Sequence, residues 1–228
     1  MQGTYSKAVT LVSLLLTACG GSTGDQATRG DTTAAASVTS ARPAILIIGT
    51  SLTAGYGIDL TEAWPAAIQR RIDAAGLSFR VVNAGVSGET SAGALRRADW
   101  ILAREHPVVL VLETGGNDGL RGLDPDTLKA NILGVFAKAR ALKPAPALVL
   151  MAMEAPPNLG DRYTRRFHDA YVEAARETGA TLIPFFLDGI AGVDSLNQPD
   201  GIHPNARGAD LAAANAWKTL SEVLRKSP

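Results

Sequence analysis

From residue 42 onward, the chain alternates between two patterns of hydrophobic residues. Short runs are almost continuously apolar, as in strands whose two faces are both buried. The longer stretches between them place apolar residues three or four positions apart, which is typical of helices with one buried face. The short runs predict five strands, at Ala44–Ile48, Phe79–Val82, Val108–Leu112, Ala147–Ala152 and Thr181–Phe185.

The longer stretches carry the signals of helices. Asp124 before Pro125 is a typical helix start, and apolar residues continue at helical spacing to Leu142. Similar spacing predicts helices around Trp64–Ile72, Tyr163–Tyr171 and Leu211–Leu224. Strands that alternate with helices form βαβ units, so we expect one α/β domain with three layers, α/β/α, around a five-stranded parallel sheet.

The first 41 residues follow neither pattern. Lys7 is the only charge before an apolar run of 11 residues, Ala8 to Ala18, whereas a membrane-spanning helix needs about 20. The ending Leu16-Thr17-Ala18-Cys19 resembles the bacterial lipobox, in which a lipidated cysteine becomes the mature N-terminus. We expect a lipoprotein-type signal peptide at 1–18, the lipidated cysteine and a flexible tether at 19–41, and a folded domain at 42–228.

This leader predicts the location of the protein. A lipid on Cys19 would anchor the chain in the cell envelope, facing the periplasm or at the outer membrane. The alternative is an ordinary signal peptide with an incidental cysteine, in which case the protein is secreted. The lipid anchor is the only membrane contact that we expect.

Composition excludes several function classes. Basic and acidic side chains both number 22, so there is no electrostatic reason to expect nucleic-acid binding. A single cysteine excludes an internal disulfide and a CxxC metal or redox site. With three histidines, a histidine-built metal centre is not expected either. We expect a monomer.

Candidate catalytic residues follow the predicted strands at their carboxyl ends, where the sites of α/β folds lie. Ser51 follows the first strand, Gly88 the second and Asn117 the third, and Asp200 and His203 follow the fifth. A serine nucleophile needs an adjacent base, and the base needs a third group to orient it. His203 and Asp200 can fill these roles. The backbone N–H groups of Ser51 and Gly88 and the amide of Asn117 can stabilise an oxyanion.

Each of these residues also has a purely structural interpretation when it is taken alone. A serine after a strand is most often a helix cap, and a lone glycine a turn residue. Asn117 and Asp200 could form turns or caps. His203 has little competition as the base, because His106 precedes the third strand at the wrong end of the sheet and His168 lies within a helix beside arginines.

Taken together, Ser51, Gly88, Asn117 and His203 resemble the four sequence blocks of the SGNH (GDSL) hydrolase superfamily, in order and near the expected separations. The stretch Leu112–Gly122, LETGGNDGLRG, is most similar to that of the bacterial arylesterase and multifunctional thioesterase–lysophospholipase group. The resemblance implies a flavodoxin-like sheet, no metal, no diffusible cofactor and an acyl-serine intermediate on Ser51. It covers essentially the whole folded domain.

One position departs from the family pattern. The residue before the nucleophile is usually aspartate, and here it is Thr50. Because Asp200 is expected to orient His203, the threonine should not abolish the triad. It does make the geometry of the turn around Ser51 an open question.

Residues that flank the rim are expected to bind substrate. They are Asp118, Gly119, Leu120, Pro156, Leu159 and Ile202. Their apolar members suit an acyl chain, so we expect a serine esterase acting on short- to medium-chain acyl or aryl esters, with thioesters and lysophospholipids as further candidates. One alternative is a carbohydrate or peptidoglycan O-acetyl esterase, which the 5% aromatic content argues against. The other is a catalytically silent binding lipoprotein.

Overall fold

The computed structural model describes residues 42–227. The expected signal peptide, lipidated Cys19 and tether lie outside the described residues. Within them, no helix combines the length and apolar character needed to cross a membrane.

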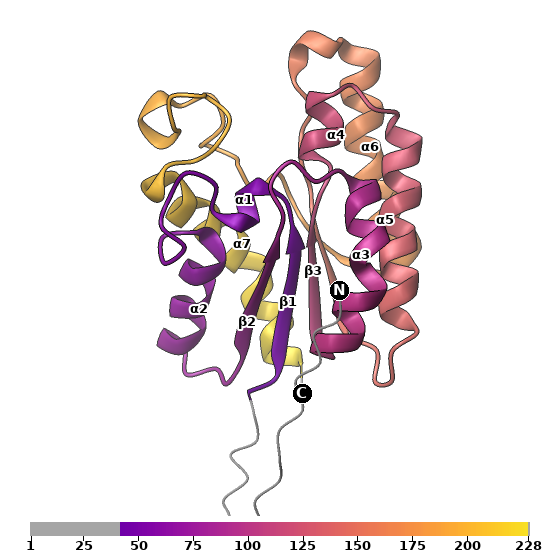
Figure 1. Ribbon diagram of the computed structural model, residues 1–228, viewed down its shortest axis with the longest axis vertical. Helices are drawn as coiled ribbons and strands as arrows, with labels where there is room; N and C mark the ends of the chain where they lie inside the picture. Colours follow the sequence, from indigo (N-terminus) through magenta and orange to yellow (C-terminus); the bar gives the residue numbers. More distant parts are fainter. Residues whose placement is uncertain (1–41, 228) are drawn as a thin grey trace, which may run out of the picture. The chain divides into compact units, whose positions relative to one another are not determined.

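A five-stranded parallel sheet forms the centre of the domain (Figure 1). The strands are β1 (Ala44–Gly49), β2 (Arg80–Gly85), β3 (Val109–Glu113), β4 (Ala147–Met151) and β5 (Thr181–Ile183). Their order across the sheet is β2-β1-β3-β4-β5, and every neighbouring pair is parallel. This is the flavodoxin-like order, which confirms the predicted fold class.

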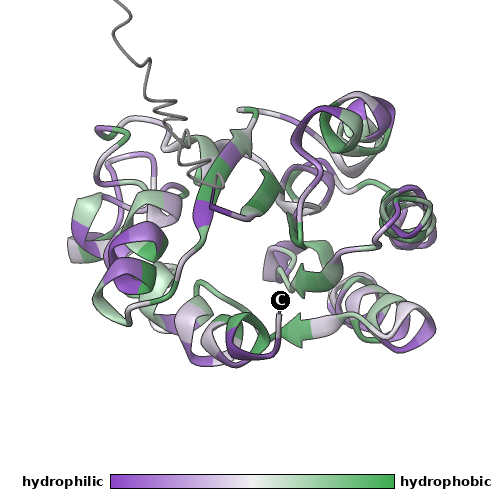
Figure 2. Cartoon of the chain, turned by 90° about the horizontal axis from the view of Figure 1, so that it is seen from below, coloured by the Kyte–Doolittle hydropathy of each residue, from purple (hydrophilic) through white to green (hydrophobic). Residues whose placement is uncertain are grey.

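Long helices cover both faces of the sheet, as the views from the side and from below show (Figures 1 and 2). On one face lie α2 (Trp64–Ala74) and α7 (Ala206–Lys226), which pack against each other. On the other lie α3 (Ser91–Glu105), α5 (Pro125–Arg140) and α6 (Asp161–Thr178). The side chain of Asp124 accepts hydrogen bonds from two backbone N–H groups of α5, which confirms the predicted helix start.

Strand burial agrees with the hydrophobic pattern in the middle of the sheet and departs from it at both edges. The edge strand β5 ends at Ile183, short of the predicted end at Phe185, and its first two residues are only partly buried. Every residue of β1 and β3 is buried, because helices cover them on both faces. In contrast, β2 is only partly buried and runs to Gly85, beyond the predicted end at Val82. Asn83 continues the pairing with β1 because ladder hydrogen bonds come from the backbone and do not require an apolar side chain.

The chain reverses direction across the sheet between β1 and β3. From β1 it moves outward to β2, and it then returns to place β3 on the other side of β1. The loops that follow β1 and β3 therefore diverge at one rim and leave room for a ligand there. Short helices form on these loops: α1 (Ser51–Ala54) after β1 and α4 (Gly116–Leu120) after β3. Single 3₁₀ turns, Pro157–Leu159 and Asp194–Leu196, follow β4 and β5.

Candidate active site

Ser51 is the first residue of α1, immediately after β1. Only 8% of the residue is exposed, so it lies nearly buried at the carboxyl end of β1. As the first helical residue, it has a backbone N–H with no carbonyl of its own helix to bond. The N–H is therefore available as an oxyanion donor.

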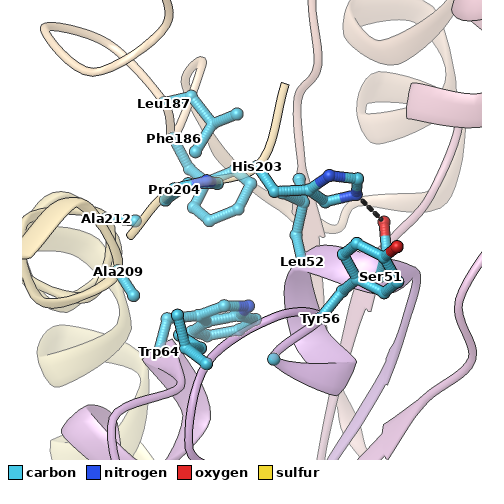
Figure 3. A pocket seen from close by; sticks show the side chains of 12 residues that line it. Ser51, Leu52, Tyr56, Trp64, Phe186, Leu187, His203, Pro204, Ala209 and Ala212 are labelled. Atoms are coloured by element: carbon cyan, nitrogen blue, oxygen red, sulfur yellow. Dashed lines mark hydrogen bonds between the residues drawn. The ribbon is translucent and has the colours of Figure 1, made fainter. Parts of the chain in front are cut away.

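The structure brings the three predicted triad residues together. The Nε2 atom of His203 lies 2.9 Å from Ser51 Oγ, the contact marked in Figure 3, and its Nδ1 atom lies 2.7 Å from Asp200 Oδ2. When Nδ1–H donates to Asp200, Nε2 can accept the serine proton. Serine, histidine and aspartate are thus arranged as a nucleophile, a base and an orienting carboxylate.

Backbone groups hold Asp200 in its ionised form. Its Oδ1 atom accepts hydrogen bonds from the N–H groups of Ile202 and His203, at 2.9 and 3.0 Å. Together with the imidazole contact, and led by the backbone N–H of His203, these bonds lower the pKa of Asp200 from 3.8 to about 2. Asp200 is therefore a carboxylate at any pH at which a serine hydrolase works.

The loop that carries His203 is fastened to its surroundings on both sides. Gln198 N–H donates to the His203 carbonyl at 2.7 Å, and its side-chain amide donates to the carbonyls of Tyr56 and Pro204. Asn205 caps α7 by accepting a hydrogen bond from Gly208 N–H. These contacts connect the histidine loop to the loop after α1 and to α7.

Tyr56 is a neighbour of the base that the sequence did not indicate. Its ring lies against the imidazole of His203, with the ring centroids 4.7 Å apart and the planes tilted by 41° (Figure 3). An aromatic ring at this distance limits the rotation of the imidazole. The only signal in the sequence was its place between two glycines after Ser51.

Glu113 is the second residue that sequence reasoning missed, and it explains how Thr50 fits beside the nucleophile. It ends β3 with a fully buried side chain. The carboxylate accepts hydrogen bonds from Thr50 N–H (2.8 Å), Thr50 Oγ1 (2.9 Å) and Thr53 Oγ1 (2.8 Å). The pKa of Glu113 is raised because burial outweighs these hydrogen bonds. The carboxylate therefore ties the turn around Ser51 to the neighbouring strand.

We expect Thr50→Val to lower the free energy of unfolding by about 1–3 kcal/mol, the usual cost of a buried polar group that loses a partner. Valine has nearly the same shape but cannot donate to Glu113. The midpoint of urea unfolding measures the loss. Thr50→Ser keeps the hydroxyl and should lose less; equal losses in both variants would contradict the proposed bond to Glu113.

The two other oxyanion candidates come from the loops after β2 and β3. Gly88 has φ 76°, a conformation that favours glycine, and its carbonyl accepts a hydrogen bond from Arg121 at 3.0 Å. Asn117 uses one amide N–H to donate to the Glu89 carbonyl at 3.0 Å, which leaves its second N–H available. Asn117 lines the cleft that contains Ser51, whereas Gly88 lies outside the lining of that cleft.

Gly115 is required for the position of Asn117. It precedes α4 with φ 96°. A Cβ atom at this position would lie 2.0 Å from the hydroxyl of Tyr171, which donates to the Thr114 carbonyl. The glycine thus allows the chain to turn tightly from β3 into α4.

Asn117→Ala is expected to lower kcat by about 10²- to 10³-fold with little change in KM, because an oxyanion donor acts mainly on the transition state. Steady-state kinetics with a p-nitrophenyl ester tests this. Asn131→Ala is the matched control, because it removes a comparable amide hydrogen bond, to Ser91 Oγ, outside the cleft. A fall in kcat of less than fivefold for Asn117→Ala would contradict the oxyanion role.

A cleft of about 710 Å³ opens beside the triad, within the range of about 300–1,000 Å³ that is typical of small-molecule sites. Ser51 and His203 lie at one side of it. Of the predicted substrate-binding residues, Leu120, Pro156 and Ile202 line it. The further lining residues are Thr50, Leu52, Gly116, Met153, Glu154, Ala155, Pro157, Phe185, Leu187, Ala191 and Gly201.

Three predicted substrate contacts lie outside the lining of the cleft. Asp118 is 3% exposed, and its carboxylate accepts hydrogen bonds from the backbone N–H and the hydroxyl of Ser91. It therefore caps α3 and does not face the cleft. Gly119 is buried against the Phe167 ring. Leu159 lies outside the cleft lining, near Gly122.

The other histidines lie where the sequence indicated. His106 ends α3, at the amino end of β3. His168 is on α6 with its side chain half exposed, and it contacts Glu154. In residues 42–227, no group of three histidine, aspartate or glutamate side chains is arranged to hold a metal ion.

Comparisons with known proteins agree with this geometry. The model of the GDSL-like Lipase/Acylhydrolase family matches residues 47–211. Esterase TesA of Pseudomonas aeruginosa is 41% identical over 180 residues, which cover 79% of this chain and 89% of that protein. Thioesterase 1/protease 1/lysophospholipase L1 of Escherichia coli K12 is 36% identical over 161 residues, which cover 71% of this chain and 75% of that protein.

A solved structure extends the similarity to three dimensions. The psychrotrophic esterase EstA from Pseudoalteromonas sp., inhibited by monoethylphosphonate, has a TM-score of 0.75 and 35% identity, covering 80% of this chain and 98% of its own. The family match, the sequence identity and the fold all lead to the same assignment. This chain belongs to the GDSL-like lipase/acylhydrolase family, the SGNH hydrolases, and is a carboxylic ester hydrolase.

Proposed function

We propose that the protein is a serine esterase that hydrolyses short- to medium-chain acyl or aryl esters through an acyl intermediate on Ser51. One observation carries the proposal. Ser51 Oγ lies 2.9 Å from His203 Nε2, and His203 Nδ1 lies 2.7 Å from an ionised Asp200, at the side of a largely apolar cleft.

In the first half of the reaction, Ser51 Oγ attacks the ester carbonyl and its proton passes to His203 Nε2. The carbonyl oxygen becomes an oxyanion, for which the N–H groups of Ser51 and Gly88 and the amide of Asn117 are the proposed donors. The bond from carbon to the leaving oxygen then breaks, and the proton on His203 passes to the departing alcohol. Asp200 stabilises the imidazolium while it exists.

In the second half, water attacks the acyl group on Ser51. His203 takes a proton from the water and returns it to Ser51 Oγ as the acyl–serine bond breaks. The products are the carboxylic acid and the regenerated enzyme. The ring of Tyr56 beside the imidazole restricts the rotation of His203 during both halves of the reaction.

The lining of the cleft supports an acyl substrate over a sugar. Leu120, Met153, Pro156, Phe185 and Ile202 present apolar surface beside Ser51, and burial of apolar area is the main source of affinity for a hydrocarbon chain. Phe185 is the only aromatic ring in that lining apart from the imidazole, so the described residues offer little surface for stacking a sugar ring. Thioesters and lysophospholipids, the substrates named for the Escherichia coli relative, are candidate substrates of the same site.

A p-nitrophenyl ester series from acetyl to palmitoyl, together with a fluorophosphonate label, tests the function. We expect hydrolysis with a maximum in kcat/KM at a short or medium chain, and a label that peptide mass analysis assigns to Ser51. Activity on acetylated xylan or peptidoglycan, with none on these esters, would favour an O-acetyl esterase. A protein that neither hydrolyses any ester nor takes up the label would be a silent binder.

A further inference from the structure

The cleft beside Ser51 contains a charge that the mechanism does not use. Among its described lining residues, Glu154 is the only carboxylate, and no lysine or arginine lines it. The other lining side chains are apolar or uncharged, apart from His203. A single carboxylate at the wall of an otherwise apolar site is a means of selecting substrates by charge.

The chain on both sides holds Glu154 in place. It follows β4, and its neighbours Met153 and Ala155 are 6% and 8% exposed. Its own side chain is 38% exposed, and Oε1 lies 2.8 Å from Nδ1 of His168 on α6. Glu154 thus lines the cleft, and the contact with His168 holds its carboxylate between the cleft and α6.

Two arginines of α6, the helix that carries His168, have ionic contacts with other residues. Arg166 pairs with Asp126 and Glu173, and Arg165 lies 3.8 Å from Asp161. Glu154 contacts the half-exposed imidazole of His168. Among the described residues, no arginine or lysine forms an ion pair with Glu154.

We propose that Glu154 gives the cleft a charge preference: esters that carry a cationic group, such as a quaternary ammonium, on the acyl or the alcohol part are favoured over anionic esters. The inference rests on the proposed function, because it concerns the substrates of that same site. A charge beside a low-dielectric wall interacts more strongly than in open water, and dissolved salt weakens this interaction.

Two matched substrate series test the preference with the full chain. The first compares p-nitrophenyl esters of 4-(trimethylammonio)butyrate, its neutral isostere 5,5-dimethylhexanoate, and glutarate with a free carboxylate. The second compares butyrylcholine with its neutral isostere 3,3-dimethylbutyl butyrate. The readout is the ratio of kcat/KM for the charged ester to that for its neutral partner, at low and high salt, so that changes common to all substrates cancel.

In the wild-type protein, the ratio of kcat/KM for the cationic ester to that for its neutral partner is expected to exceed the corresponding ratio for the anionic ester. Glu154→Gln should lower the ratio for the cationic ester by about fivefold or more in at least one series. Glu154→Lys should reverse the preference, which a mere change of shape would not do. High salt should weaken the wild-type preference. Glu222→Gln is the matched control, because it removes the same charge from an exposed position near the C-terminal end of α7, and it should leave the ratios unchanged.

Ratios that stay the same in both Glu154 variants, while the neutral esters are still hydrolysed, would overturn the charge preference and leave the proposed function standing. Absence of Ser51-dependent hydrolysis of the neutral esters would overturn the proposed function and this inference with it.

Discussion

Replacing Ser51 with alanine is expected to lower kcat/KM for a p-nitrophenyl ester by about 10⁴-fold or more, as the loss of the nucleophile does in other serine hydrolases. The substitution removes the one atom that can form the acyl intermediate. It leaves the oxyanion donors and the cleft in place, so a small residual rate above that of water is expected. Steady-state kinetics, and loss of the fluorophosphonate label, measure the effect.

Folding should not contribute to this loss. The recorded hydrogen bond of the Ser51 hydroxyl is the contact with His203, and alanine is compatible with the first turn of α1. Ser195→Ala is the control, since Ser195 is exposed on the loop after β5 and outside the cleft. If Ser51→Ala retained more than a hundredth of the wild-type rate with an unchanged unfolding midpoint, another group would have to be the nucleophile.

The sequence predicted the sheet best where burial is complete. Every residue of β1 and β3 is buried on both faces, and such strands appear in the sequence as continuous apolar runs. The edge strand β2 ends with Asn83, Ala84 and Gly85, which look like a loop. Their pairing with β1 depends on backbone hydrogen bonds, which leave no trace in the side-chain pattern.

Spacing made the triad predictable, but the group that supports its nucleophile was not. Asp200 and His203 are three residues apart, so one short loop can bring them together. Glu113 lies 63 positions from Thr50, and only the pairing of β1 with β3 brings its carboxylate to that turn. A glutamate at the end of an apolar strand was the only available signal.

Substrate contacts were the least predictable part of the site, because neighbouring residues on a loop point in different directions. Asp118 follows Asn117 directly, yet its carboxylate binds Ser91 whereas Asn117 lines the cleft. Glu154 was not singled out, although it lines the cleft beside the predicted Pro156. The direction of a loop side chain depends on tertiary packing, which a single sequence does not encode in any local pattern.

Asp200→Asn is expected to lower kcat by about 10³- to 10⁴-fold at neutral pH, because a neutral amide neither orients Nδ1–H of His203 reliably nor stabilises the imidazolium. The carboxylate in the wild-type protein has a pKa of about 2. It therefore stays ionised throughout the working range, and no step in the wild-type pH–rate profile above pH ~3 should belong to it. Kinetics over pH 5–9 for both proteins measures the loss, and a loss of less than tenfold would contradict the orienting role.

The same pKa separates an orienting role from a structural one. Folding lowers the pKa of Asp200 from 3.8 to about 2, so its carboxylate stabilises the fold above pH ~4, and this contribution disappears as the pH falls through 2. Because the side chain is 38% exposed, this contribution is small, and the unfolding midpoints of wild type and Asp200→Asn should differ little at pH 7. The difference between the two midpoints should decrease further as the pH falls below ~4. A variant that loses its activity but keeps most of its stability at pH 7 places Asp200 in the triad; a parallel loss of both would make it a structural support of the histidine loop instead.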